Sequence, residues 1–471
     1  MPTGTHVHRH VLIAVRGINF SMVVPYFPGG QNPFTRLLAC RAPRADGRGT
    51  IPLMPLPARL VVVGQGYVGL PLSVRAVDMG YHVIGVDVNK DRVAQLKAGK
   101  SYVEDVSAER VCSLLASGRF LPTAAYRDCA DFDVAVITVP TPLREGLPDL
   151  AFIEESGRAL GPYVRAGCTV VLESTTYPGT TEELLAPILE AASGLRAGRD
   201  FHLGYSPERI DPGNPTFGFA NTPKVVSGVT GASCRAVQDF YDTLIDRTVP
   251  VSSCKVAELT KLLENTFRHV NIALVNELAM FAHDLGIDVW ETVNASSTKP
   301  FGFMRFTPGP GVGGHCLPID PSYLSWDVKR RLGTTFRFVE LANDVNDHMP
   351  VYVVRRITAS LNSDRKAVNG SKILLLGLAY KKNTSDARES PAVKIAETLM
   401  ALGADVRAVD PHVLHTAAPN IPRALLTREE VAAADLVVVL TDHDSFDYGL
   451  LLGAAAVLDT RCVVPAECEL L

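Results

Sequence analysis

Short apolar runs alternate with longer segments of helical periodicity in two parts of the chain. Residues 60–63 and 82–86 have the length and composition of strands buried on both faces, and residues 133–143 and 168–180 repeat this pattern before proline-punctuated loops. A second series of strand, loop, helix and strand starts near residue 372 and ends at Asp410. This alternation predicts the α/β class, with two doubly wound parallel sheets.

A helical period separates the two series. Residues 256–286 read as one long helix, on which Lys261, Asn265 and Arg268 share a face, with Asn276 about two turns further on. These residues fit either a solvent-exposed face or the wall of a cavity, and asparagine, an indifferent helix former, favours the cavity. Because long apolar helices often form subunit interfaces, we expect a helical dimerisation domain here and a homodimer or higher homo-oligomer.

The first series contains glycines in a pattern with a defined physical role. Gly64, Gly66 and Gly69 follow residues 60–63 in GxGxxG spacing, and Asp87 follows the second apolar run. A strand, a tight glycine turn, a helix N-terminus and an acid for the adenosine ribose together make a dinucleotide site. We therefore predict a Rossmann-like domain that binds NAD, although basic residues just behind the acid leave NADP open.

The second series differs in its first loop. It keeps Gly377 but has Ala379 and Lys382 where the other two glycines would fall, so we do not expect it to hold a second dinucleotide in the same way. Lys381, Lys382 and Arg388 make the loop cationic, which suits a phosphate-bearing ligand, although surface lysines without a ligand fit the pattern too. The predicted parts are an N-terminal extension (1–56), a dinucleotide-binding Rossmann domain (57–250), a central helical domain (251–366) and a C-terminal ligand-binding α/β domain (367–471).

Composition narrows the function classes. The 471 residues carry 46 basic and 50 acidic side chains, a balance that does not favour a nucleic-acid partner. Nine cysteines without CxxC pairs or histidine-rich spacing indicate neither a disulfide framework nor a metal site. No apolar run reaches the roughly 20 residues that a membrane span needs. We expect a cytoplasmic protein with no membrane partner and no metal.

The first 50 residues differ from the rest of the chain. Their only acid is Asp46, whereas arginines are spread along them. The composition is that of a transit peptide, but there is neither a clear amphipathic period nor a small-residue cleavage site. We expect residues 1–56 to be disordered or to reflect a start codon assigned too early, with Met54 as the alternative start.

The segment "PGPGVGGHCLPIDPSYL", residues 308–324, surrounds one thiol with turn-forming residues. Taken alone, it fits a tight loop with an incidental cysteine as well as it fits a site. Beside a nicotinamide cofactor, a Cys316 thiolate can attack an aldehyde and give a thiohemiacetal, then a thioester that water hydrolyses. This chemistry needs an oxyanion partner and a base, for which Lys261, Asn265 and Asp320 are suitable types.

The motifs of the chain resemble those of one family over about residues 58–465. "GQGYVG", "VPTPL", "EST", "SPERIDPG", "ELTKLLEN", "GVGGHCLPID" and "GLAYKKNTSDARESP" occur in the order found in the UDP-glucose/GDP-mannose dehydrogenases. The resemblance implies oxidation of the C6 alcohol of a UDP-sugar to the uronic acid with two NAD per turnover, a step that feeds polysaccharide synthesis. "YSPERIDPG", "ENTFRHVNIALVNELA" and "TKPFGF" resemble the bacterial branch for acetamido sugars. The expected substrate is therefore UDP-N-acetylglucosamine.

The resemblance also implies roles for individual residues. A nucleophile, two oxyanion partners, two residues for the hydrolytic water and one acid near C6 are implied as Cys316, Lys261, Asn265, Asp320, Thr175 and Glu208. Residues implied to line NAD are Gly64, Gly66, Tyr67, Val68, Gly69, Asp87, Arg92, Pro140, Thr141, Ser174 and Arg388. Residues implied to bind the UDP-sugar are Arg209, Pro308, Gly309, Gly311, Gly313, Tyr380, Lys381 and Arg461.

Some positions depart from the family's pattern. Pro212 stands where UDP-glucose enzymes have a second glutamate, and Ile319 where they often have a lysine. Both differences occur in the acetamido-sugar branch, so they put UDP-glucose in doubt rather than catalysis. Arg305 stands where a proline would be expected, and Lys299 lies near a basic residue that in the family reaches the neighbouring subunit's substrate.

Other functions stay open at this point. Within the family the alternatives are UDP-N-acetylmannosamine, UDP-N-acetylgalactosamine and then UDP-glucose, because spacing does not separate C2 and C4 epimers. A single-step β-hydroxyacid or 6-phosphogluconate type dehydrogenase would need no thiol and would yield one NADH per substrate. A non-catalytic NAD-binding scaffold would tolerate the loss of Cys316 and Lys261 together.

Overall fold

The computed structural model describes residues 9–15, 18–24, 58–144, 146–211, 214, 216–314, 317–465 and 468–471. Residues 1–53 and 54–471 form separate units. Of the N-terminal extension, the structure describes the backbone of β1 (Arg9–Val15) and β2 (Ile18–Val24), which pair antiparallel. The rest of the predicted extension, with Met54, lies outside the described residues.

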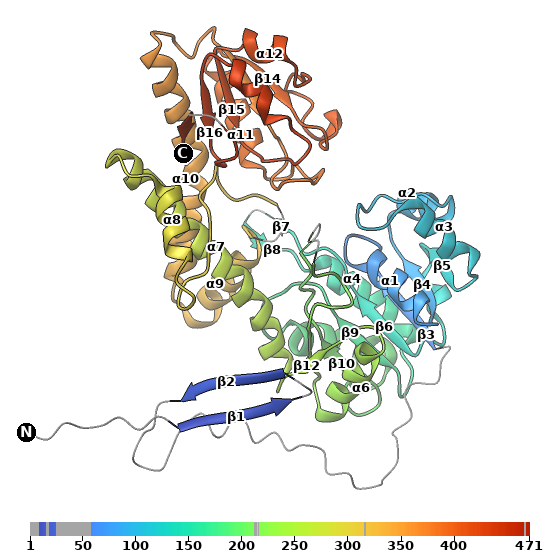
Figure 1. The fold of residues 1–471 in the computed structure, drawn as a ribbon. Coiled ribbons are helices and arrows are strands. Elements are labelled where there is room, and N and C mark those ends of the chain that lie inside the picture. The colour runs from blue at the N-terminus through green and yellow to red at the C-terminus, as the bar shows by residue number, and fades with distance from the viewer. Residues whose placement is uncertain are drawn as a thin grey trace, which may run out of the picture. The chain divides into compact units, whose positions relative to one another are not determined.

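The first sheet has six parallel strands in the order β10-β9-β6-β3-β4-β5 (Figure 1). They are β3 (Arg59–Val63), β4 (His82–Val86), β5 (Phe120–Thr123), β6 (Val134–Ile137), β9 (Thr169–Leu172) and β10 (His202–Tyr205). The chain order reverses direction at β3, because β4 lies on one side of it and β6 on the other. Such a switch point leaves a crevice at the carboxyl ends of the two strands, where ligands of doubly wound sheets bind.

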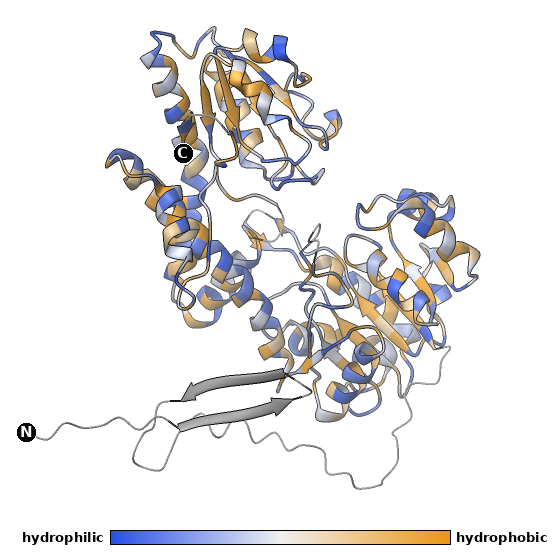
Figure 2. Ribbon diagram, viewed as in Figure 1, coloured by the Kyte–Doolittle hydropathy of each residue, from blue (hydrophilic) through white to orange (hydrophobic). Residues whose placement is uncertain are grey.

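Helices cover both faces of this sheet. In β3, Val61 and Val63 belong to one apolar cluster, while Leu60 and Val62 belong to another. Successive side chains of a strand point to opposite faces, so a wholly apolar strand needs helices on both. The strands stand out as hydrophobic in Figure 2. The helices are α1 (Gly69–Asp78), α2 (Lys90–Lys97), α3 (Ala108–Ala116), η2 (Tyr126–Cys129), α4 (Ala151–Leu160), η3 (Gly161–Tyr163), η4 (Thr181–Leu185), α5 (Ala186–Ser193) and α6 (Gly231–Asp242).

Short strand pairs accompany the sheet. They are the antiparallel pair β7 (Leu143–Arg144) and β8 (Leu147–Pro148), and the parallel pair β11 (Lys224–Val226) and β12 (Thr248–Pro250). The strand β11 lies just beyond the loop that follows β10, so it adds the side chain of Lys224 to the edge where the candidate site lies.

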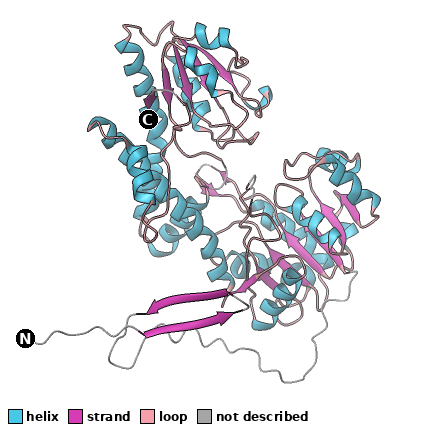
Figure 3. Cartoon of the chain, in the orientation of Figure 1, coloured by secondary structure: helices cyan, strands magenta, loops and turns pink. Residues whose placement is uncertain are grey.

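The centre of the chain is helical, as Figure 3 shows. The long helix expected at residues 256–286 is α7 (Cys254–Asp284), with Ser253 accepting a hydrogen bond from the Val256 N–H as its N-cap. It packs against α10 (Arg337–Ser363), with α8 (Val289–Ser297) and α9 (Asp320–Leu332) beside it.

The second sheet is also parallel, in the order β14-β13-β15-β16-β17. Its elements are β13 (Lys372–Leu376), α11 (Pro391–Ala401), β14 (Asp405–Val409), η5 (His415–Ala417), α12 (Arg428–Ala433), β15 (Leu436–Val439), η6 (Tyr448–Gly453), β16 (Val457–Asp459) and β17 (Glu469–Leu470). Here β13 lies at the switch point. The predicted α/β fold, with two Rossmann-like sheets joined by a helical part, is confirmed. Among the described helices, none combines the length and apolar character needed to cross a membrane.

Candidate functional site

The three glycines after β3 differ in the space around them. Gly64 has a φ of +91°, and a Cβ on it would lie 2.8 Å from the Thr138 carbonyl oxygen. A Cβ on Gly69 would lie 1.8 Å from the Gly64 carbonyl oxygen, so α1 packs on the turn only through a glycine. A Cβ on Gly66 would meet no atom within 4 Å, so this residue borders open space. No side chain caps α1, so the start of this helix stays open to a pyrophosphate.

Asp87 follows β4 and is buried. Its Oδ2 accepts a hydrogen bond from the Gln65 N–H at 3.0 Å, and its Oδ1 accepts one from the Asn89 N–H at 2.8 Å. The carboxylate therefore ties the glycine turn to the start of α2. The Arg92 guanidinium lies 3.5 Å from Asp87 Oδ2 and 5.6 Å from the centre of the Tyr102 ring. This arrangement presents an acid where a dinucleotide places its adenosine ribose.

A cavity of about 460 Å³ lies beside the glycine turn. Gly66, Tyr67 and Arg92 line one part of it, and Arg388 from the C-terminal part lines another. Arg388 Nε and Nη2 donate to the two carboxylate oxygens of Asp386 at 2.8 and 2.6 Å, which fixes the guanidinium plane. Four of the residues predicted to bind NAD thus meet at one cavity.

The other residues predicted near NAD lie in neighbouring loops. Val68 is the half-buried N-cap of α1. Exposed Pro140 and half-buried Thr141 follow β6, and buried Ser174 follows β9, with its hydroxyl donating to the Val139 carbonyl oxygen at 2.7 Å. The carboxyl ends of β6 and β9 therefore bring these residues to the same edge of the sheet as the glycine turn. Thr175, predicted to act on water, is half-buried beside Ser174.

Lys261, Asn265 and Asp320 come together as predicted. Lys261 and Asn265 lie on α7 and are buried, and the Asn265 amide donates a hydrogen bond to Asp320 Oδ2 at the start of α9. Burial raises the pKa of Asp320 to about 6, against the opposing effects of the Lys261 ammonium and the Asn265 hydrogen bond. A carboxylate with this pKa is suited to accept a proton near neutral pH.

Glu208 lies in the loop after β10, with its carboxylate held at several points. Its Oε1 accepts hydrogen bonds from the Arg209 and Ile210 N–H groups at 2.6 and 2.7 Å, and its Oε2 lies 3.2 Å from Lys224 Nζ. Burial is the largest single effect and would raise the pKa of Glu208, but Lys224, hydrogen bonds from Glu173 and the Ile210 N–H, and Lys261 together hold that pKa below its usual range. The charge of Lys261 thus lowers the pKa of both Glu208 and Asp320.

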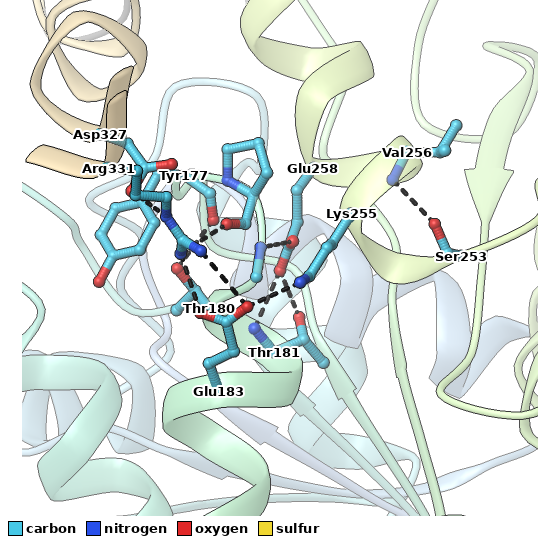
Figure 4. Close-up of polar contacts among 12 residues, drawn as sticks. Tyr177, Thr180, Thr181, Glu183, Ser253, Lys255, Val256, Glu258, Asp327 and Arg331 are labelled. Atoms are coloured by element: carbon cyan, nitrogen blue, oxygen red, sulfur yellow. Dashed lines mark hydrogen bonds and ion pairs between the residues drawn. The ribbon is translucent and has the colours of Figure 1, made fainter. Parts of the chain in front are cut away.

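A second buried acid fixes α7 to the first sheet (Figure 4). Glu258, one turn before Lys261, accepts hydrogen bonds from the Gly179 N–H and from both the N–H and hydroxyl of Thr181. Glu183 of η4 pairs with Lys255 of α7 at 2.7 Å and with Arg331 of α9 at 2.9 Å. These contacts hold together the two helices that carry Lys261 and Asp320.

A second cavity, of about 330 Å³, lies at the carboxyl end of β13. Gly311, Tyr380, Lys381 and Arg461, all predicted to bind the UDP-sugar, line it. Arg461 Nε donates to Asp442 at 3.0 Å, so the guanidinium is held in place. Two basic side chains at an aromatic wall fit a nucleotide diphosphate.

The other glycines of the predicted loop have close neighbours. A Cβ on Gly309 would lie 2.6 Å from Arg461 Nη1, and a Cβ on Gly313 would lie 2.8 Å from Tyr380 Cβ. Pro308 is buried beside them. The Gly309 N–H donates to Asn276 Oδ1 of α7 at 3.0 Å. Cys316 lies outside the described residues, as does Pro212, so the role of Cys316 stays a prediction.

Several predicted residues have other partners. Arg209 is not among the residues lining the second cavity; its guanidinium pairs with Glu264 at 2.7 Å and donates to the Pro223 carbonyl oxygen. Lys381 pairs with Asp211 at 2.7 Å. Arg305 is exposed and donates to Asn294 at 3.0 Å.

Sequence reasoning missed two groups of residues. Glu173 and Lys224 form a buried ion pair behind Glu208. His269 and Asn346 lie behind Asn276 in a chain of buried hydrogen bonds. The motifs "EST" and "ENTFRHVNIALVNELA" contained Glu173 and His269 without indicating a role for them, whereas Lys224 and Asn346 are single polar positions outside the quoted motifs. Among the described residues, no group of three metal-ligating side chains is present.

Three family models match successive parts of the chain. They describe the NAD-binding, central and UDP-binding domains of the UDP-glucose/GDP-mannose dehydrogenase family, and they match residues 58–245, 255–348 and 374–466.

Named relatives cover most of the chain. UDP-N-acetyl-D-mannosamine dehydrogenase of Pyrococcus horikoshii is 34% identical over 391 residues, 82% of this chain and 90% of the relative. UDP-N-acetyl-D-glucosamine 6-dehydrogenase of Pseudomonas aeruginosa is 39% identical over 359 residues, 75% of this chain and 83% of the relative. The solved structure of the Pyrococcus horikoshii UDP-D-ManNAc dehydrogenase superposes with a TM-score of 0.80 at 32% identity, covering 87% of this chain and 97% of the other.

These matches agree with the two cavities and with the acids gathered around Lys261. The glycine turn, the open space beside Gly66 and Asp87 fit NAD, and the cavity at β13 fits a UDP group. The chain belongs to the UDP-glucose/GDP-mannose dehydrogenase family, whose members are NAD-dependent UDP-sugar oxidoreductases.

Proposed function

We propose that the protein oxidises the C6 alcohol of a UDP-acetamido sugar to the uronic acid in two steps, with Cys316 as the nucleophile. The carrying observation is the buried group in which Asn265 hydrogen-bonds to Asp320 and the Lys261 ammonium acts on both Asp320 and Glu208. A single hydride transfer needs one base. An amide paired with one acid, and an ammonium whose charge acts on that acid and on a second one, also fit an oxyanion and a water, which the second step requires.

Bound NAD supplies the hydride acceptor in each of the two oxidation steps. In the first step a carboxylate takes the proton of the C6 hydroxyl as the C–H bond breaks, and an aldehyde results. The Cys316 thiolate then adds to the aldehyde carbon, and the Lys261 ammonium and the Asn265 amide stabilise the oxygen of the thiohemiacetal. Loss of the second hydride from that carbon leaves a thioester.

Hydrolysis completes the sequence. Asp320 takes a proton from water, with Thr175 positioned to hold the water, and the resulting hydroxide adds to the thioester carbonyl carbon. The C–S bond then breaks, which releases the uronate and returns the Cys316 thiolate. The pKa of Asp320, raised to about 6 by burial, suits this proton transfer.

UDP-N-acetylglucosamine is the proposed substrate, with UDP-N-acetylmannosamine as the second candidate. The first is supported by the acetamido-branch motifs and by the Pseudomonas aeruginosa relative at 39% identity. The second is supported by the Pyrococcus horikoshii relative and by its solved structure.

The test is the yield of NADH per mole of sugar at completion. UDP-N-acetylglucosamine, its manno and galacto epimers and UDP-glucose are compared, with Cys316→Ser in parallel and Cys112→Ser, an exposed cysteine on α3, as the matched control. We expect two NADH per sugar with an acetamido sugar, no full turnover by Cys316→Ser and normal turnover by Cys112→Ser. One NADH per sugar, together with an active Cys316→Ser protein, would show single-step oxidation instead.

We also propose a homodimer built on α7. Its exposed large apolar side chains recur at steps of three, four and seven: Val256, Leu259, Leu263, Phe267, Leu274, Leu278, Phe281 and Leu285. At 100° per residue they form one stripe, opposite the buried face that carries Lys261, Asn265 and Asn276. An apolar stripe of this length on a helix is seldom left in water, and a second copy of the same helix is complementary to it.

A further inference from the structure

A buried lysine lies behind Glu208, between two carboxylates. Lys224 starts β11, Glu173 follows β9, and Glu208 follows β10, so three neighbouring strand ends bring them together. The Lys224 side chain is 5% exposed and the Glu173 side chain is fully buried. Charged side chains are rarely buried unless they are paired, and here one cation serves two acids.

The Lys224 ammonium lies close to three oxygen atoms. Lys224 Nζ donates to Glu173 Oε1, lies 3.2 Å from Glu208 Oε2, and lies 3.3 Å from the Pro207 carbonyl oxygen. The Tyr241 hydroxyl donates to the second oxygen of Glu173 at 2.8 Å, and the Tyr241 ring lies 5.1 Å from Nζ. Glu173 is thus held on both oxygens, and Lys224 cannot move without leaving a buried acid unpaired.

Both oxygens of the Glu208 carboxylate are consequently held in place. Its Oε1 accepts two backbone N–H groups, and its Oε2 faces Lys224. The Lys261 ammonium acts on it from α7. The side chain of Glu208 itself is 14% exposed, so it is more accessible than the buried pair behind it.

We propose that Lys224, anchored by Glu173, is a positioning residue that holds the Glu208 carboxylate ionised and aimed at the reacting carbon of the sugar. The proposal rests on the proposed function for the reaction, but the state of the carboxylate can be measured without turnover. Lys224 touches neither cavity predicted for NAD or for the UDP group.

The opposite pKa shifts of the two acids support the proposal that Glu173 anchors Lys224 and that Lys224 holds Glu208. Burial raises the pKa of Glu173, and the nearby Lys224 opposes it, whereas Lys224 and the backbone hydrogen bonds hold the pKa of Glu208 low against burial. With one ammonium between two acids, Glu173 is therefore the acid that takes up a proton more readily, and Glu208 is the acid that the ammonium keeps ionised. The titratable groups that act on Glu208 or are acted on by it are Glu173 from the end of β9, Lys224 of β11, Tyr241 of α6 and Lys261 of α7.

Lys224→Met keeps the length of the side chain and removes the charge. We expect kcat to fall at least tenfold, KM for NAD to stay within about twofold, and the pKa of Glu208, measured by infrared titration as described below, to rise by about one unit or more, because an opposite charge near a carboxylate lowers its pKa by that amount. Lys224→Arg, which keeps the charge, should restore that pKa in part. Lys366→Met, which breaks an exposed pair with Asp435, is the matched control and should change none of these.

The removal of one buried partner can also destabilise the fold, so a second variant is needed. Lys224→Met combined with Glu173→Gln removes the whole pair and leaves a single acid. If Lys224 were only structural, this double variant, once its unfolding temperature recovers, would regain the wild-type kcat and the wild-type pKa of Glu208, which would overturn the proposal. We expect kcat to stay low and that pKa to stay raised.

Infrared titration measures Glu208 without turnover. The carboxylate signal of Glu208 is the difference between a protein and its Glu208→Gln variant, taken once in the wild-type background and once in Lys224→Met. A midpoint that rises in Lys224→Met supports the assignment even if no UDP-sugar is oxidised, and an unchanged midpoint overturns it even if the enzyme is active. Failure of the positioning role and failure of the proposed reaction are thus separate results.

Discussion

At the scale of single residues, Asp320 is a position where the proposed chemistry needs an ionised carboxylate that costs the fold stability. It is almost wholly buried, its carboxylate accepts a hydrogen bond from the Asn265 amide, and burial raises its pKa to about 6. At pH 7 and above the fold must therefore hold a buried carboxylate in its ionised form. A group whose pKa is higher in the folded than in the unfolded state stabilises the fold at low pH and loses that contribution as the pH rises through the folded value.

Asp320→Asn should therefore inactivate the enzyme and stabilise it. We expect turnover to fall by about 100-fold or more, because a base is lost, and the free energy of unfolding at pH 8 to rise by about 1–3 kcal/mol, because no buried charge remains. The gain should disappear near pH 4, where the wild-type carboxyl is protonated. Thermal unfolding of the variant and the wild type at pH 8 and pH 4 measures this difference in stability.

The exposed Asp344 on α10 provides the control for this substitution. Asp344→Asn should leave turnover and unfolding at both pH values unchanged. A pH 8 unfolding temperature of Asp320→Asn equal to or below that of the wild type would contradict the argument from burial.

Residue types and spacing predicted the polar residues proposed to act on the substrate, but not the buried ion pair behind them. Lys261, Asn265 and Asp320 were identified as chemically suitable, and they lie together. Lys224 and Glu173 were not found, because they are 51 positions apart and a lysine that opens a strand reads as an exposed charge. The contact exists only because β9 and β10 are neighbours and β11 follows closely, which no local pattern encodes.

At the scale of elements, α7 combines a buried polar face with the glycine loop. Asn276 Oδ1 accepts from the Gly309 N–H at 3.0 Å, and its amide donates to Asn346 of α10 at 2.9 Å. Asn346 in turn donates toward His269, whose Nε2 lies 2.7 Å from Asn343. Hydrogen bonds between uncharged side chains thus fix the position of the glycine loop relative to α7 and α10.

Asn276→Ala should loosen the loop without unfolding the helix. It leaves the Gly309 N–H and the Asn346 oxygen without these partners, a cost of about 1–3 kcal/mol. We expect KM for the UDP-sugar to rise about tenfold and KM for NAD to change little, since Gly309 lies beside Arg461 at the second cavity. Asn271→Ala, whose exposed side chain bonds only to its own helix at Phe267, is the control on the same element. Equal effects of the two substitutions on KM would refute the coupling.

The elements themselves were predictable wherever a period or a motif defined them. The long helix was expected at residues 256–286 and lies at Cys254–Asp284, and the glycine spacing predicted β3, α1 and β4. The helix α9 was not predicted, since its first turn overlaps the proline-rich cysteine loop and its apolar positions are few. Arg209 was assigned to the substrate from its motif alone, whereas its partner Glu264 lies on α7, 55 positions away.

At the scale of the whole chain, both sheets place a cavity at the carboxyl end of the strand where their order reverses. The residues of the C-terminal part that line the first cavity, among them Arg388, show that the second sheet takes part in enclosing the predicted NAD site. The Ser385 N–H also donates to Glu104 at 3.0 Å, and Lys381 pairs with Asp211. Two sheets that share contacts in this way can exclude water from the reacting carbon, which protects the aldehyde and the thioester.

The apolar stripe of α7 gives the last prediction. Leu263 and Leu274 are 63% and 60% exposed and lie about three turns apart on one line of the helix. In a two-fold interface each copy contributes the same patch, so two aspartates per chain introduce four buried charges. Leu263→Asp combined with Leu274→Asp should therefore convert a particle of twice the chain mass of 50.7 kDa into a monomer, as measured by light scattering after gel filtration. Leu425→Asp, at an apolar residue 79% exposed outside the stripe, should leave the mass unchanged. A wild-type protein that is monomeric at micromolar concentration, or a double variant that stays dimeric, would show that the stripe is covered by something other than a second copy.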